Sequence, residues 1–153
     1  MKRLIFSLLA LLLSVVVSYS QQIGIVRNAQ YRITANLDPV KKDFEKLLAE
    51  HQLPAVLTNF EIKTIVDKVT GNPFYMLVGT NRSRTIKVAR ALHLSAGYLN
   101  FYKGTEEVWG ILICSGCTAG CLPEISNGKW LCNGDCQQAD QVCKTDIVAV
   151  MPQ

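Results

Sequence analysis

The sequence predicts an α+β domain in which one amphipathic helix packs on an antiparallel β-meander of about five strands, followed by a disulfide-rich C-terminal segment. Three observations lead to this prediction. Apolar residues recur at helical spacing over residues 38–52, the spacing changes to two from residue 60 onward, and all six cysteines lie between Cys114 and Cys143. We expect a cleaved signal peptide at 1–20, an α+β body at 21–113, and a cysteine-rich segment with a last strand at 114–153 that packs on the body.

The first 20 residues have the three parts of a secretory signal peptide. Lys2 and Arg3 precede an apolar run over residues 4–17, and Ser18 and Ser20 place small residues at −3 and −1 of a cleavage site after Ser20. The apolar run is shorter than the roughly twenty residues that span a bilayer. We therefore expect a secreted or periplasmic protein that has no membrane attachment after cleavage.

The charge of the mature chain argues against nucleic acid as a partner. Two of the 16 basic residues belong to the leader, so 14 remain against 12 acidic residues, a net charge of about +2. The densest cationic stretch spans a turn and the start of a strand, and strand alternation divides its charges between two faces. We expect it to be a solubilising hairpin; its members are Arg82, Arg84, Lys87 and Arg90.

Residues 38–52 are expected to form the helix. Asp38 suits the N-cap position, Pro39 suits the first helical position, and Pro54 prevents the helix from continuing. The apolar stripe consists of Val40, Phe44, Leu47 and Leu48.

The strands are expected from period-two patterns that are rich in β-branched and aromatic residues. A weak strand signal lies at 31–34, and stronger signals lie at 60–69, 74–80, 85–94, 98–102, 108–114 and 145–151. The connections between successive strands are short enough for antiparallel hairpins. Such a sheet has one face to bury, and the helix stripe is the expected cover for that face.

The cysteine segment is too short and too poor in apolar residues to order itself without covalent or metal links. Its cysteines are Cys114, Cys117, Cys121, Cys132, Cys136 and Cys143, with the spacing C-x2-C-x3-C-x10-C-x3-C-x6-C. An even number of cysteines in an exported chain favours three disulfides. Fifteen connectivities are possible, and we favour pairings that cross the loop at Gly128.

Two alternatives involve free thiols. Cys114, Cys117, Cys132 and Cys136 could present four thiolates to zinc, although Cys121 and Cys143 would then be left over. Alternatively, the C-x-x-C pair formed by Cys114 and Cys117 could be a redox site, but glycine and proline follow it where a helix would be needed to stabilise a thiolate.

No catalytic residue or cofactor-binding motif emerges from the rest of the chain. The two histidines, His51 and His93, are expected at a helix end and on an exposed strand position, without a ligand or nucleophile nearby. We therefore expect a protein that is not an enzyme and carries no cofactor.

The string CSGCTAGCLPEISNGKWLC, which follows a signal peptide, a helix and a meander, resembles the cysteine-rich tails of small exported bacterial proteins of unassigned function. The resemblance covers mainly residues 110–143 and implies no activity. The sequence as a whole thus favours an exported, disulfide-stabilised, non-catalytic domain that binds another macromolecule. A zinc-binding or thiol-redox protein that uses the cysteine cluster is the alternative.

Overall fold

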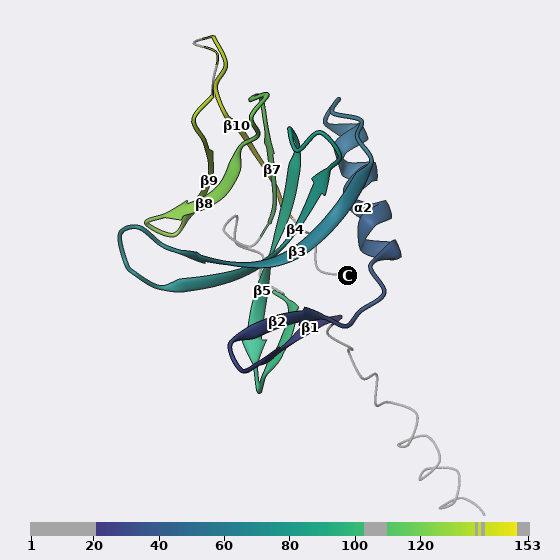
Figure 1. The fold of residues 1–153 in the computed structure, drawn as a ribbon, viewed down its shortest axis with the longest axis vertical. Helices are drawn as coiled ribbons and strands as arrows, with labels where there is room; N and C mark the ends of the chain where they lie inside the picture. The colour runs from purple at the N-terminus through teal and green to yellow at the C-terminus, as the bar shows by residue number, and fades with distance from the viewer. Residues whose placement is uncertain (1–20, 103–109, 137, 139, 150–153) are drawn as a thin grey trace, which may run out of the picture.

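The computed structural model describes residues 21–102, 110–136, 138 and 140–149. Over this part of the chain there are one helix and ten strands, arranged as an eight-stranded antiparallel sheet and a separate two-stranded hairpin (Figure 1). The expectation of about five strands was too low, and the domain is richer in β-structure than a helix on a short meander. The predicted signal peptide at 1–20 and parts of the predicted strands at 108–114 and 145–151 lie outside the described residues.

The eight strands of the main sheet are β1 (Gln22–Arg27), β2 (Gln30–Ile33), β3 (Leu57–Val66), β4 (Pro73–Asn81), β5 (Lys87–Ser95), β6 (Tyr98–Phe101), β7 (Ile111–Ser115) and β10 (Lys144–Val148). The hairpin consists of β8 (Leu122–Ser126) and β9 (Lys129–Asn133), and the helix is α2 (Asp38–Glu50).

β5 is the branch point of the sheet. One edge of β5 pairs with β4, whereas the other edge pairs with β7 over residues 87–90 and with β6 over residues 92–95. The sheet continues from β4 to β3, from β7 to β10, and from β6 through β1 to β2. The expected β3–β4, β4–β5 and β5–β6 hairpins are confirmed, but the expected hairpin between β6 and β7 is wrong because β7 pairs with β5 instead.

The sheet curls until β2 meets β3. The Thr64 hydroxyl donates a hydrogen bond of 2.7 Å to the Tyr31 hydroxyl, and the rings of Tyr31 and Tyr75 meet edge to face at 5.8 Å. This curl encloses an apolar interior on the side of the sheet that faces the helix.

The N-terminus of α2 differs from the prediction, which placed the N-cap at Asp38. Leu37 occupies the N-cap position in a helical conformation, and no side chain caps the helix from there. The Asn36 carboxamide oxygen instead accepts the backbone N–H of Asp38 at 3.0 Å. The helix is held to the sheet by Glu45, whose carboxylate accepts the backbone N–H of Leu57 at 2.8 Å.

The helix-side core confirms the predicted stripe. Val40, Phe44 and Leu48 are buried, and Leu47 is partly buried beside them. The buried members of this cluster are Ile23, Val40, Phe44, Leu48, Leu57, Leu77, Val88, Leu92, Leu99, Phe101 and Ile113.

The opposite face of the sheet is also buried, contrary to the expectation of a single buried face. Met76 and Val78 of β4 lie on it, alternating with Leu77 on the helix side, and Ile125 and Trp130 of the hairpin cover it. Figure 1 shows α2 and the β8–β9 hairpin on opposite sides of the sheet. The second cluster consists of Met76, Val78, Ala89, Ala91, Leu112, Cys114, Cys117, Cys121, Ile125, Trp130 and Cys132. The cysteine segment is therefore the second cover of the sheet.

Candidate site in the cysteine segment

The six cysteines form three disulfides, in line with the expectation from their even number. The pairs are Cys114–Cys132, Cys117–Cys136 and Cys121–Cys143, with Cα–Cα distances of 5.4, 5.3 and 5.7 Å. These distances lie in the usual range for disulfides. Each bond crosses the loop at Gly128, which is the type of pairing that the sequence favoured.

One bond joins two strands, whereas the cysteines of the other two bonds lie in the segments that connect the strands. Cys114 lies in β7 and Cys132 in β9, so their disulfide joins the main sheet to the hairpin that covers it. The Thr145 hydroxyl of β10 accepts the backbone N–H of Cys132 at 2.9 Å and reinforces the same junction. The closed loops span 18, 19 and 22 residues, for which chain entropy alone gives about 3 kcal/mol each, and the three contributions are not additive because the loops overlap.

Lys87 lies beneath the cysteine segment. Its side chain is buried, and its ammonium donates to the backbone carbonyl of Cys121 at 2.7 Å and to that of Arg84 at 3.4 Å. Burial lowers the pKa of Lys87, and the nearby positive charge of Lys63 adds to this effect. The expectation that Lys87 serves as a solubilising surface cation was wrong, because its strand face is the one that the cysteine segment covers.

Asp67 ties the turn after β3 to the turn of the hairpin. Its carboxylate accepts the backbone N–H groups of Val69 and Thr70 in its own turn, at 2.8 and 3.1 Å. It also accepts those of Asn127 and Gly128 across the interface, at 3.1 and 2.7 Å. The Gly128 hydrogen bond is the largest cause that lowers the pKa of Asp67 from 3.8 to about 2, against the opposing effect of desolvation.

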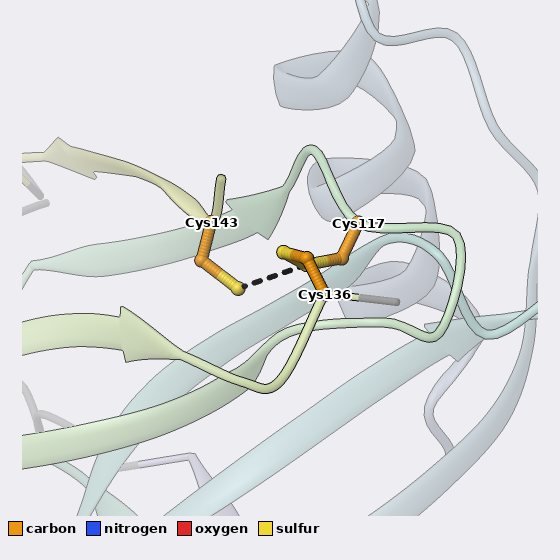
Figure 2. A group of neighbouring side chains, drawn as sticks. All are labelled: Cys117, Cys136 and Cys143. Carbon is orange, nitrogen blue, oxygen red and sulfur yellow. Dashed lines mark hydrogen bonds between the residues drawn. A yellow bond between two sulfur atoms is a disulfide. The ribbon is translucent and has the colours of Figure 1, made fainter. Parts of the chain in front are cut away.

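Three sulfur atoms from separate segments converge at the edge of the cysteine segment. The sulfurs of Cys117, Cys136 and Cys143 lie within 4.8 Å of one another, and the Sγ atoms of Cys117 and Cys143, which belong to different disulfides, are 3.5 Å apart (Figure 2). Cys117 is 2 % exposed, whereas Cys136 and Cys143 are half-buried. This three-sulfur cluster of Cys117, Cys136 and Cys143 is the most unusual chemical grouping in the described part of the chain.

The cluster differs from both thiol sites that the sequence suggested. The alternative zinc set shares only Cys117 and Cys136 with the cluster, because Cys114 and Cys132 form their own disulfide between β7 and β9. The redox pair is not formed either, because Cys114 and Cys117 bond to different partners. A metal would bind thiolates, which Cys117, Cys136 and Cys143 can offer only after their disulfides are reduced.

An open groove lies on the helix side of the sheet next to Cys117. Its volume is about 560 Å³, and its walls come from the residues that follow α2, the turn before β5, the end of β7 with the residues after it, and the exposed strand β10. The lining residues are His51, Leu53, Thr85, Ile86, Ser115, Gly116, Cys117, Thr118, Lys144 and Asp146. The other histidine, His93, is exposed on its strand, as expected, with its ring packed edge to face against Tyr102 at 6.2 Å.

The groove and Asp67 were both missed from the sequence. A groove depends on the pairing of β7 with β5, which brings together residues that lie far apart in the chain. The signal for Asp67 was present in part, because an aspartate followed by Thr70, Gly71 and Asn72 is typical of a side chain that hydrogen-bonds to its own turn. Its second set of partners lies 60 residues further along the chain and has no local signature.

The structure defines an antiparallel β-domain whose second sheet face is covered by a disulfide-tied hairpin. No family model matches the chain, and neither a curated protein nor a solved structure is significantly similar to it. The three disulfides fit an oxidising extracellular or periplasmic environment. Within the described residues no helix has the length and apolar character needed to cross a membrane.

Proposed function

We propose that the chain is an exported, non-catalytic domain that binds another macromolecule, and that the groove beside Cys117 is its contact surface. The observation that supports this proposal is the composition of the groove. Leu53 and Ile86 offer apolar contacts, and Lys144 and Asp146 offer charges of opposite sign on the exposed strand β10. An apolar centre with polar groups at its rim is the usual composition of a protein–protein interface.

The groove is built from both layers of the protein. Leu53 and Ile86 belong to the body, whereas Cys117 and Lys144 belong to the cysteine segment. Disulfides at Cys117 and at Cys143, the residue before Lys144, restrict the movement of this second wall. A wall fixed in advance loses less conformational entropy on binding, so it favours affinity for a partner.

A non-catalytic role is favoured by the state of the one cysteine that lines the groove. Cys117 is in a disulfide, so it does not offer the thiolate that a cysteine nucleophile requires. The histidine of the groove, His51, follows the end of α2. The groove therefore resembles a contact surface more than a reaction centre.

Charge reversal in the groove tests the proposal. The tagged protein, with Lys144→Glu or Asp146→Lys, is used to capture partners by cross-linking from the growth medium or periplasm of the producing cell. We expect the unmodified chain to retain one partner that both variants bind roughly tenfold more weakly, because each change reverses the sign of a charge at the contact.

The matched control is Lys46→Glu, which reverses a charge on the outer face of α2, where the Lys46 side chain is 79 % exposed. This variant should retain the partner fully. The proposal fails if no partner exceeds background, or if the groove variants and the Lys46 variant bind the partner equally well.

A further inference from the structure

We propose that four cysteines of the segment form a relay for thiol–disulfide exchange, which is an activity separate from the proposed binding function. An external thiol that opens the Cys117–Cys136 bond at Cys136 leads to a new Cys117–Cys143 bond and a free thiol at Cys121. The structure contains the starting arrangement of this relay, because the sulfurs of Cys117 and Cys143 already lie 3.5 Å apart in two different disulfides.

Residue exposure distinguishes the two ends of the Cys117–Cys136 bond. Cys136 is half-buried and lies after β9, outside any strand, whereas its partner Cys117 is only 2 % exposed. A small external thiolate therefore reaches Cys136 more readily than Cys117. Attack on the Cys136 sulfur expels Cys117 as the leaving thiolate, because thiol–disulfide exchange proceeds through displacement of one sulfur by another.

The second step follows from the spacing of the sulfurs. The freed Cys117 sulfur lies in contact with the Cys143 sulfur, so it can attack the Cys121–Cys143 bond with little movement of the backbone. This attack forms the Cys117–Cys143 bond and expels Cys121. In total, one external thiol and two disulfides become a mixed disulfide at Cys136, a Cys117–Cys143 disulfide and one thiol at Cys121, and the proton of the external thiol ends on Cys121.

The surroundings of Cys121 favour this product. Cys121 is fully buried, and its sulfur lies 3.2 Å from the backbone carbonyl oxygen of Ser115. Burial disfavours a charged thiolate, whereas a neutral thiol can donate a hydrogen bond to that carbonyl. The carbonyl of Ser115 therefore provides an acceptor for the proton that the relay delivers to Cys121.

The third disulfide, Cys114–Cys132, serves as an internal control for the relay. Cys114 and Cys132 lie within β7 and β9, and their bond is outside the three-sulfur cluster. A thiol released at Cys114 is therefore outside the sulfur contact through which the relay runs. Opening this bond should leave the other two unchanged.

Two substitutions start the exchange at opposite ends of the relay, and both should give the same new bond. Cys136→Ser frees Cys117, which should displace Cys121, and Cys121→Ser frees Cys143, which should displace Cys136. Each purified variant is incubated with a trace of monothiol, quenched with acid, alkylated and mapped by mass spectrometry of non-reduced peptides. We expect the Cys117–Cys143 bond to predominate in both variants, with the free thiol at Cys121 in the first and at Cys136 in the second.

The control variant Cys132→Ser should keep Cys117–Cys136 and Cys121–Cys143 and leave the thiol at Cys114. The proposal is overturned if Cys136→Ser retains Cys121–Cys143 with a free Cys117, or if the control rearranges to the same extent as the other two.

The unsubstituted protein provides a test that does not depend on the folding of any variant. Limited treatment with a dithiol, which is oxidised to its cyclic disulfide as one protein disulfide is reduced, should give a first product alkylated at Cys121 and Cys136 with Cys117 bonded to Cys143. A first product alkylated at Cys117 and Cys136, with Cys121–Cys143 intact, would show that no relay operates.

Discussion

The Asp67 carboxylate joins two turns that lie 60 residues apart in the chain. It accepts two N–H groups from each turn, so it satisfies four backbone donors that the contact between body and hairpin would otherwise remove from water. An ion pair reinforces the contact nearby, where the Lys68 ammonium lies 2.6 Å from the Glu124 carboxylate. Single side chains therefore decide how the hairpin sits on the sheet.

The stability of the protein should depend on the charge of Asp67 in acid. Because folding lowers its pKa from 3.8 to about 2, ionised Asp67 stabilises the fold above about pH 4, and this contribution is lost as the pH falls toward 2. Asp67→Asn should lower the melting temperature at pH 7 by roughly 5 °C or more, and the difference from the unsubstituted protein should shrink between pH 4 and 2. Thermal unfolding followed by circular dichroism measures both effects, with the exposed Asp140→Asn as the control. A difference that does not change over this pH range would show that the Asp67 charge is not what holds the turns.

Gly120 is required where the segment meets the turn before β5. It has a φ of +84°, and a Cβ atom at this position would collide with the backbone carbonyl of Arg84. Gly120→Ala should therefore lower the free energy of unfolding by about 2 kcal/mol or more, because backbone strain and a steric clash act together. Gly71→Ala is the matched control, since its φ is +72° but no atom lies within 4 Å of the added Cβ. Equal losses in urea denaturation would mean that the contact with Arg84 has no effect.

Single residues differ in how far the sequence predicts their roles. The cysteines could be assigned to disulfides because their number is even and because the signal peptide predicted from the sequence implies an oxidising compartment. Lys87 could not be placed, because a lysine in a strand is usually exposed and only the three-dimensional contact with the Cys121 carbonyl explains its burial.

At the level of elements, the β8–β9 hairpin covers one face of the sheet, as α2 covers the other. Trp130 is 6 % exposed and meets Phe74 of β4 edge to face at 6.3 Å, just as Phe44 of α2 is buried against the other face. Both covers bury aromatic side chains on strands of the same sheet. The sheet should therefore lose stability when either cover is weakened.

Trp130→Ala tests this equivalence. Loss of a buried aromatic side chain should reduce the free energy of unfolding by about 3–5 kcal/mol, as should Phe44→Ala on the opposite face. Leu122→Ala in the same hairpin is the control and should cost less than about 1 kcal/mol, because Leu122 is 49 % exposed. If Trp130→Ala left the unfolding of the sheet unchanged, the hairpin would be a separate module and not a cover.

Periodicity predicted the elements that have a strong apolar pattern and missed those that do not. α2 was found because its buried residues repeat at helical spacing, and the strands β3 to β6 were found because they are rich in β-branched and aromatic residues and are separated by turn residues. β1 was missed because Gly24 interrupts it, and this glycine is needed where a Cβ would meet the Arg32 carbonyl. β8 and β9 were missed because each buries few side chains. The burial of both sheet faces could have been inferred from the unbroken apolar run 74–78 in β4.

At the level of the whole molecule, the disulfides join the two layers that noncovalent contacts bring together. Cys114–Cys132 is the direct link, because it bonds a strand of the main sheet to a strand of the hairpin. Replacing both residues by alanine should lower the free energy of unfolding by about 3 kcal/mol, the loss expected for a closed loop of 18 residues. Urea denaturation of the double variant measures the loss. No change in midpoint would indicate that this bond does not restrain the unfolded chain.

The account as a whole depends on the cysteine segment being bonded across to the sheet in one defined pattern. Mapping of disulfides in native, unreduced protein by proteolysis and mass spectrometry tests this most directly. We predict Cys114–Cys132, Cys117–Cys136 and Cys121–Cys143 as the dominant bonds, with a mass increase of six hydrogens on full reduction. Free thiols, a bound metal ion, or a pattern in which Cys114 is not bonded to Cys132 would contradict the account.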